Sequence, residues 1–178
     1  FLVLATQNPI EQQGTYPLPE AQVDRFMLKV IVDYPRREEE RQIMEIHTQI
    51  NPPTAQVIVE PTKILHAREV IRDVYVDEKI ENYILDIVFA TRFPEQFGLE
   101  ELQPLIAWGA SPRASMYLRL AAQAHAFLEH RGYVTPEDIR AIAMDVLRHR
   151  VLITYEAEAE EKTSEDVIRM VMAKIEVP

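Results

Sequence analysis

The sequence predicts a mainly α-helical fold preceded by a short α/β segment. Two apolar runs, residues 1–6 (FLVLAT) and 27–32 (MLKVIV), have the composition of strands buried on both faces of a parallel sheet. After Pro35 the apolar residues recur instead with the period of an α-helix, and this pattern continues along the chain. We therefore place a boundary near Pro35, with residues 1–34 as the α/β part and residues 36–178 as a helical domain.

The α/β part has the order strand, short helix, strand. Between the two apolar runs, residues 19–26 (PEAQVDRF) are a helix candidate with Pro19 in the first turn, where proline is favoured. A sheet of only two strands cannot shield both of its faces, so this part implies further strands that the sequence does not contain. We interpret the start of the sequence inside an apolar run as a cut through a larger sheet domain, made by truncation or proteolysis.

Three helices are predicted after the α/β part. A charged helix covers residues 36–50 and ends at an Asn-Pro-Pro stop, and after a polar extended linker a second helix covers residues 61–70. Asp77 has the position of an N-cap for the third helix. The apolar residues that we expect these last two helices to bury are Ile64, Leu65, Ile71, Ile80, Ile84, Leu85, Ile87 and Val88.

Three further helices follow a connection rich in proline and glycine. Ser111 and Pro112 have the N-cap and first-turn positions of the clearest helix in the chain, and Gly132 ends it. Thr135 caps the next helix and Ser164 caps the last, and a short strand-like piece and a solvated acidic run are expected between them. The residues expected on the buried faces are Met116, Leu120, Ala124, Phe127, Leu128, Ile139, Ile142, Ala143, Val146, Leu147, Val167, Ile168, Val171 and Ile175.

The composition excludes several classes of function. A net charge of −10 disfavours broad electrostatic binding to nucleic acid or to a membrane surface, but it is compatible with a local basic site for phosphate. The absence of Cys removes disulfides, thiol catalysis and Cys-based zinc sites, and no apolar run approaches the roughly 20 residues that span a bilayer. His125 and His130 fall on different helix faces, so we expect no metal site. We interpret the chain as cytoplasmic.

Nucleotide hydrolysis is not expected of this chain alone. Its four glycines are Gly14, Gly98, Gly109 and Gly132, and none belongs to a G-x-x-x-x-G-K-[ST] phosphate loop. The sequence also lacks an apolar strand that ends in the paired acids needed to hold Mg²⁺. We therefore expect no cofactor for the chain by itself.

Two polar residues of the α/β part are candidates for contact with a phosphate. Asn8 follows the first apolar run, and ligands of open α/β sheets bind beyond the carboxyl ends of the strands. The alternative is that Asn8 only caps the turn made with Pro9. If Phe26 turns into the core, the guanidinium of Arg25 points outward and can reach a phosphate, including one held by a neighbouring subunit. The alternative for Arg25 is a surface pair with an acid such as Asp24.

Arg113 has an electrostatically unfavourable position for a purely structural residue. It lies in the first turn of the helix that Ser111 begins, where the macrodipole is positive and disfavours an added cation. An anion bound there by free N–H groups and the guanidinium would make the position favourable. The alternative is that Arg113 reaches an Asp or Glu at the surface. The basic run at residues 148–150, by contrast, lies at a helix C-terminus, where positive charge is favoured.

Three stretches of the sequence resemble the MoxR group of AAA+ ATPases, in the branch that also holds the magnesium-chelatase subunits. The first is residues 3–26 (VLATQNPIEQQGTYPLPEAQVDRF), and the others are residues 109–114 (GASPRA) and residues 133–151 (YVTPEDIRAIAMDVLRHRV). The last two are similar to the C-terminal lid of that family. The resemblance implies that residues 1–34 are the last two strands of the AAA+ core and that the rest is a helical AAA+ lid domain.

The resemblance also implies a role for each candidate residue. Asn8 matches the sensor 1 residue, which positions the attacking water, Arg25 matches the arginine finger, and Arg113 matches the sensor 2 arginine. ATP and Mg²⁺ are then expected in the intact parent protein, with Walker A and Walker B motifs upstream of this sequence. Because the two core strands are not neighbours in such a sheet, we expect the residues before Pro35 to be rearranged, disordered or exchanged between chains.

The leading interpretation is the C-terminal part of a MoxR-type ATPase that couples ATP binding and hydrolysis to chaperone-like remodelling or maturation of client proteins. An arginine finger acts on a neighbour's nucleotide, so the parent is expected to form a ring with itself, with six subunits as the expected count. The fragment alone is expected to be inactive. The alternative is a non-enzymatic helical interaction module. A nucleic-acid binder that uses residues 135–150 as a helix-turn-helix fits the acidic charge poorly.

Overall fold

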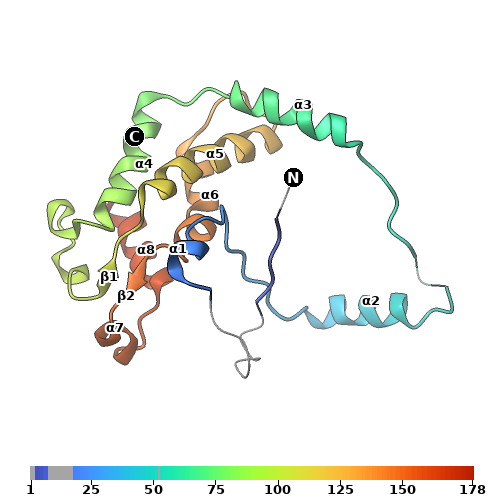
Figure 1. Ribbon diagram of the computed structural model, residues 1–178, viewed down its shortest axis with the longest axis horizontal. Helices are drawn as coiled ribbons and strands as arrows, with labels where there is room; N and C mark the ends of the chain where they lie inside the picture. The colour runs from blue at the N-terminus through green and yellow to red at the C-terminus, as the bar shows by residue number, and fades with distance from the viewer. Residues whose placement is uncertain (1–2, 8–17, 52) are drawn as a thin grey trace.

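The computed structural model describes residues 3–7, 18–51 and 53–178, and this part of the chain is mainly helical (Figure 1). The helices are α1 (Glu20–Val23), α2 (Arg37–His47), α3 (Pro61–Arg72), α4 (Glu78–Ala90), α5 (Pro112–Leu128), α6 (Pro136–Leu147), α7 (Tyr155–Ala159) and α8 (Ser164–Lys174). Two 3₁₀ turns, η1 (Pro94–Phe97) and η2 (Glu100–Leu102), and two strands, β1 (Ile106–Trp108) and β2 (Leu152–Ile153), complete the described elements. The mainly α-helical fold class is therefore confirmed.

Four helices enclose the hydrophobic core. α5 packs against α4 and α6, and α8 also packs against α4 and α6. Packing of their apolar faces, together with η2, buries large side chains away from water, and this burial is the main favourable contribution to the free energy of folding. Those fully buried side chains include Tyr83, Ile87, Leu102, Leu118, Ile139, Leu147 and Ile168.

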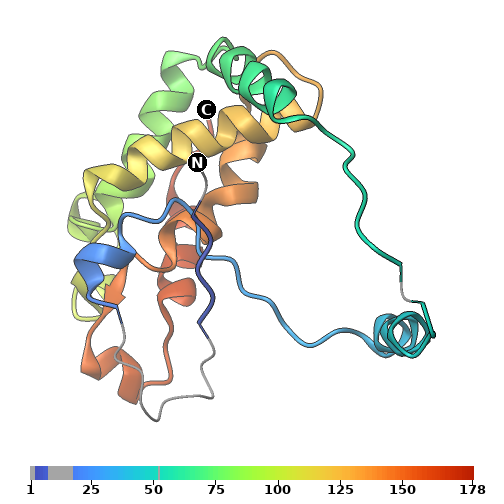
Figure 2. The same cartoon turned by 45° about the vertical axis from the view of Figure 1, so that its right-hand side comes forward.

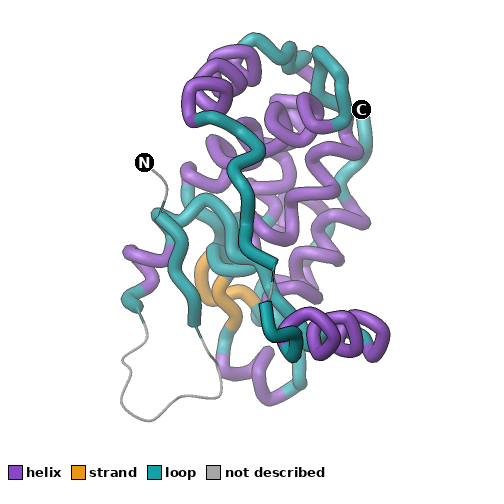
Figure 3. Tube along the Cα trace, turned by 90° about the vertical axis from the view of Figure 1, so that its right-hand side faces the viewer, coloured by secondary structure: helices purple, strands orange, loops and turns teal. Residues whose placement is uncertain are grey.

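A small antiparallel sheet lies beside this helical body. β1 pairs with β2, with Ile106 opposite Ile153 and Trp108 opposite Leu152, and the register shifts between these two pairs. β2 lies in the strand-like piece that the sequence predicts after α6. Figure 3 shows the two strands, in orange, side by side.

Side-chain caps begin the helices near the positions that the sequence predicts. Asp77 and Ser111 each accept a backbone N–H two residues further on, at 2.9 and 3.3 Å, as expected for the N-caps of α4 and α5. Thr135 starts α6 with a capping box, as expected. For α8 the prediction is one residue late, because the N-cap is Thr163 rather than Ser164.

The capping box of α6 contains a buried carboxylate. Asp138 is fully buried, and it accepts hydrogen bonds from the guanidinium of Arg131 and from the backbone N–H of Thr135 at 2.8 Å. Nδ1 of His125 lies 2.6 Å from the same carboxylate. Burial by itself would raise the pKa of Asp138, but the hydrogen bonds, led by that from Arg131, outweigh burial and lower this pKa to about 2. The cluster ties the end of α5 to the start of α6.

The buried face of α5 differs from the prediction. Met116, Leu120 and Leu128, expected in the core, are 60%, 41% and 71% exposed. Helical spacing fits either face of this helix, and small side chains let α5 approach α4 and α6 closely enough to pack without voids. The side chains buried instead are Ala114, Leu118, Ala121, Ala122, Gln123 and Ala126.

Two smaller expectations about burial are also wrong. Ile64 and Leu65 of α3 are exposed, because α3 lies at the edge of the body, where its packing partner is α5. Ile71, at the end of the same helix, is partly buried. In α4, Leu85 points away from the core, while Ile80, Ile84, Ile87 and Val88 are buried as expected.

The two strands expected in residues 1–34 are absent from the described residues of that part. Residues 3–7 and 27–32 have no regular secondary structure, whereas the short helix expected between them is present as α1. A strand needs a row of backbone partners, and within the described residues neither segment pairs with another strand. A backbone hydrogen bond of 2.8 Å from Lys29 to the carbonyl of Asp145 holds the second segment to α6. The rearrangement expected before Pro35 stays a prediction.

α2 stands apart from the helical body (Figure 2). Residues 28–36 lead to it, and residues 48–51 and 53–60 lead away from it, without helix or strand. α2 has no buried residue, and its apolar side chains at Ile43, Met44 and Ile46 are exposed. The folded core therefore begins with α4 and not with α2.

Candidate functional site

The turn that leads into α5 is held against the end of α4. The buried hydroxyl of Thr91 donates to the carbonyl of Val88 at 2.7 Å and accepts the backbone N–H of Ala110 at 3.0 Å. A Cβ on Gly109 would lie 2.3 Å from the carbonyl oxygen of Thr91, so only glycine fits this close approach. These contacts fix where α5 begins.

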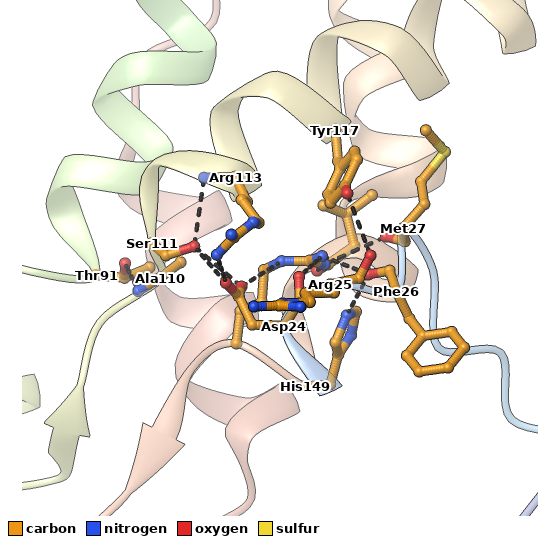
Figure 4. Close-up of polar contacts among 12 residues, drawn as sticks. Asp24, Arg25, Phe26, Met27, Thr91, Ala110, Ser111, Arg113, Tyr117 and His149 are labelled. Atoms are coloured by element: carbon orange, nitrogen blue, oxygen red, sulfur yellow. Dashed lines mark hydrogen bonds and ion pairs between the residues drawn. The ribbon is translucent and has the colours of Figure 1, made fainter. Parts of the chain in front are cut away.

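Asp24, which follows α1, lies at the N-terminus of α5 (Figure 4). Arg113 donates to its carboxylate at 2.9 Å, and the hydroxyl of Ser111 lies 2.9 and 3.0 Å from its two oxygens. The positive end of α5 thus faces a negative charge supplied from 89 residues earlier in the chain. Of the two interpretations of Arg113, the pairing with an acid is the one observed, and the acid is Asp24. The Arg113 side chain is still 48% exposed.

Arg150 holds the same carboxylate from inside the protein. Its side chain is 0% exposed, and its Nε donates to Asp24 Oδ1 at 3.1 Å. The guanidinium lies over the ring of Tyr117, 4.9 Å from the centroid, where a cation is attracted to the aromatic face. It also donates to the carbonyl of Val146, one turn earlier in α6. Arg150 therefore joins α6, α5 and the segment after α1 at one buried point.

Four consecutive carbonyl groups after α1 accept hydrogen bonds from side chains of the helical body (Figure 4). Arg150 donates to the carbonyls of Asp24 at 2.8 Å, of Phe26, and of Met27 at 3.2 Å. The hydroxyl of Tyr117 donates to the carbonyl of Arg25 at 3.2 Å. These side chains therefore satisfy the carbonyl groups of residues 24–27 where the chain turns after α1.

A fifth contact to this segment comes from a buried histidine. Nε2 of His149 lies 3.1 Å from the carbonyl of Phe26, so the neutral ring carries its proton on Nε2 and donates it. Burial, followed by the charge of Arg150, lowers the pKa of His149 to about 4. At neutral pH the ring is therefore uncharged, and it adds a hydrogen bond without adding a cation.

The site as a whole is positively charged although the chain is acidic. Burial by itself would raise the pKa of Asp24, but hydrogen bonds from Arg113 and Ser111 and the charge of Arg150 outweigh burial and lower this pKa. The ionised carboxylate faces two guanidinium groups, and the next residue in the chain, Arg25, adds an exposed positive charge. A second anion with several oxygens, such as a phosphate, is the ligand that this arrangement would attract.

Of the three predicted site residues, the structure places Arg113 against Asp24, and Arg25 is the next residue in the chain after Asp24. Arg25 is exposed and Phe26 is partly buried, as expected, and Asp24 pairs with Arg113 and Arg150 rather than with Arg25. Within the described residues, no hydrogen bond or ion pair engages the guanidinium of Arg25. Asn8 lies outside the described residues.

Sequence reasoning missed four residues of this site, namely Asp24, Tyr117, His149 and Arg150. Residues 148–150 follow the C-terminus of α6, where positive charge is favourable. Because this local reason accounts for their charge, the local pattern provided no cause to expect their contacts with residues 24–29. One signal was nevertheless present. Residues 148–150 directly follow Val146 and Leu147, which are buried, so polar side chains in this run were expected to need hydrogen-bond partners.

Two other features are absent from the described residues. Among residues 3–7, 18–51 and 53–178, no group of three or more His, Cys, Asp or Glu side chains is arranged to hold a metal ion. In the same residues, no helix has the length and apolar composition needed to cross a membrane.

Comparisons with known proteins match two parts of the chain to AAA families. Residues 100–171 match the family described as the AAA lid domain, and residues 1–28 match the ATPase family associated with various cellular activities (AAA). The chain is 44% identical over its whole length to Chaperone MoxR1 of Mycobacterium tuberculosis, and 32% identical over 85% of its length to Protein MoxR of Paracoccus denitrificans.

A solved structure supports the same assignment. The crystal structure of a "putative ATPase" from Cytophaga hutchinsonii matches the whole chain with a TM-score of 0.96 and 46% sequence identity. The chain spans about half the length of these proteins, 47% and 48% of the two relatives and 54% of the crystallised chain. The chain therefore belongs to the MoxR group of AAA+ ATPases, and its residues 100–171 match the AAA lid domain.

Proposed function

We propose that this chain supplies the sensor and lid half of an AAA+ ATPase that couples ATP binding and hydrolysis to chaperone-like remodelling or maturation of client proteins. The observation that carries the proposal is the pairing of Arg113 with Asp24 at the N-terminus of α5, beside the exposed Arg25. A phosphate group is the natural competitor for a half-exposed guanidinium at such a helix end.

The proposed division of the chain follows the same logic. Residues 1–34 belong to the AAA+ core and carry Asn8 and Arg25, while residues 36–178 form the lid and carry Arg113. The contacts of Arg150 and Tyr117 with residues 24–27 then lie at the junction between core and lid. In this arrangement the lid senses a nucleotide through Arg113.

Each proposed site residue has a physical task. Arg113 binds oxygens of the terminal phosphate and closes the lid, and Asn8 orients the attacking water through its amide. Arg25 stabilises negative charge that develops on the transferring phosphoryl group of a neighbouring subunit. Because Arg25 acts on a neighbour, the proposal includes a ring of copies, with six as the expected number. It places this ring in the cytoplasm.

ATP and Mg²⁺ are the proposed cofactors of the longer protein. Arg25 and Arg113 fit the terminal phosphate, because Arg25 is exposed and the Arg113 side chain is 48% exposed at the N-terminus of α5. The sequence has no phosphate loop to hold the remaining phosphates and no acid pair for the metal. We therefore propose that the 178-residue chain alone is inactive.

The test uses a longer polypeptide that contains this chain together with a phosphate loop. Arg25→Ala is expected to lower ATP turnover by about 10³-fold while nucleotide affinity stays within about threefold. Arg169→Ala, at an exposed arginine of α8, is the matched control and is expected to leave turnover unchanged. Full turnover in Arg25→Ala would reject the finger role, and a polypeptide that neither binds nor hydrolyses ATP would favour the interaction module instead.

A further inference from the structure

We infer that Arg150 is a positioning residue that fixes the candidate arginine finger, Arg25, to the lid, so that movement of the lid in one subunit moves the finger presented to the next. This inference rests on the proposed function. Its basis is the set of side-chain hydrogen bonds to the carbonyls of residues 24–27, which come from α5 and from the end of α6.

The first step concerns what holds the backbone of Arg25. The neighbouring carbonyls on either side, of Asp24 and Phe26, both accept from the NH2 group of Arg150. The carbonyl of Arg25 itself accepts from Tyr117, whose ring also lies under the Arg150 guanidinium. A segment held at three successive carbonyls has little freedom to rotate. Arg150 and Tyr117 therefore set the direction in which the Arg25 side chain projects from the backbone.

The second step concerns why an arginine is required at position 150. A planar guanidinium carries five N–H donors in fixed directions, whereas a lysine has three donors on one atom. Arg150 uses its donors on the Asp24 carboxylate and on carbonyls of Asp24, Phe26, Met27 and Val146. Lysine at this position keeps the charge but cannot reach these separated acceptors. The role therefore depends on shape as well as on charge.

The third step links this arrangement to the nucleotide. Asp24 is shared between the half-exposed Arg113 and the buried Arg150. If a phosphate draws Arg113 away, the carboxylate keeps Arg150 and Ser111 as partners, so it stays in place while its charge balance changes. Asp24 is joined to Arg25 by one peptide bond. Because Arg150 holds residues 24–27 to the lid throughout, a lid movement that follows phosphate binding at Arg113 carries Arg25 with it, toward the neighbour's nucleotide.

The experiment is a double-mutant cycle on ATP turnover, in the longer polypeptide that carries the phosphate loop. Arg150→Met keeps the side-chain volume but removes the donors, and it is expected to lower turnover more than about tenfold with nucleotide affinity within about threefold. Arg150→Lys is expected to rescue little of this loss. Because Arg150 acts through Arg25, adding Arg150→Met to Arg25→Ala should cause no further loss under single-turnover conditions.

A milder variant guards against misfolding. Tyr117→Phe removes the hydroxyl that binds the Arg25 carbonyl, and it is expected to lower turnover about two- to fivefold, again without effect in the Arg25→Ala background. Losses from Arg150→Met or Tyr117→Phe that multiply with that of Arg25→Ala would overturn the inference, and so would unchanged turnover in both. If Arg25→Ala itself has no effect, the proposed function fails first, which distinguishes the two outcomes.

Discussion

The carboxylate of Asp24 lies 3.1 Å from Nε of Arg150, and these two residues are 126 positions apart in the chain. This ion pair is buried on the arginine side and joins the segment after α1 to the end of α6. It therefore helps to hold residues 24–27 in a defined position against the helical body.

Replacement of Asp24 by asparagine is expected to destabilise the fold by about 3 kcal/mol, because it leaves the buried charge of Arg150 without its counter-ion. Arg113→Gln removes the other, half-exposed partner and is expected to cost less than about 1 kcal/mol. Urea unfolding of the 178-residue chain, followed by circular dichroism, measures both. Equal losses for the two variants would show that burial of Arg150 does not control the stability of this site.

The stability of the chain is expected to fall as the pH is lowered from about 6.5 to 4, because His149 becomes protonated. The pKa of His149 is lowered to about 4 in the folded state, so the unfolded state binds more protons throughout this range, and the free energy of unfolding rises with pH there. The expected loss is roughly 1–3 kcal/mol of the free energy of unfolding at pH 4, and the full stability is present above pH 6.5. Urea unfolding at a series of pH values measures it.

His149→Gln provides the control for this pH dependence. Glutamine keeps an N–H donor for the carbonyl of Phe26 and does not titrate, so the slope between pH 4 and pH 6.5 should become smaller. An unchanged slope would assign the effect to other groups.

The close approach at Gly109 predicts a large difference between two glycine substitutions. Gly109→Ala would place a methyl group 2.3 Å from the carbonyl oxygen of Thr91, and the required backbone shift is expected to cost more than about 2 kcal/mol. Gly132→Ala meets no atom within 4 Å and is expected to be neutral or stabilising by up to about 1 kcal/mol. Thermal unfolding of the two variants tests this directly, and a tolerated Gly109→Ala would contradict the packing described for α4 and α5.

The 178-residue chain is expected to bind ATP weakly or not at all. It supplies guanidinium groups for one terminal phosphate, whereas tight binding needs the backbone N–H groups of a phosphate loop, which the sequence does not contain. Isothermal calorimetry with ATP and Mg²⁺ provides the measurement. Micromolar affinity would mean that residues of this chain hold the phosphates in a way that the proposed function does not include.

Much of the helical part could be predicted from local patterns. Asp77, Ser111 and Thr135 mark helix starts because capping depends on a few neighbouring residues, and the structure confirms all three. The buried face of α5 could not be predicted in the same way. Met116 and Leu120 are more hydrophobic than the alanines that are buried instead, but the distance to α4 and α6, and not hydrophobicity alone, selects the face.

By itself, the sequence determined the helices, their caps and the family resemblance, because each of these depends on residues close together in the chain. The partners of Asp24 and the role of Arg150 were decided only by the tertiary structure. Read locally, Asp24 is a surface acid beside Arg25, and Arg150 is a basic residue in a favourable place after α6. Their pairing arises because packing of α5 and α6 buries Arg150 next to the segment that follows α1, and a buried charge is stable only beside an opposite one.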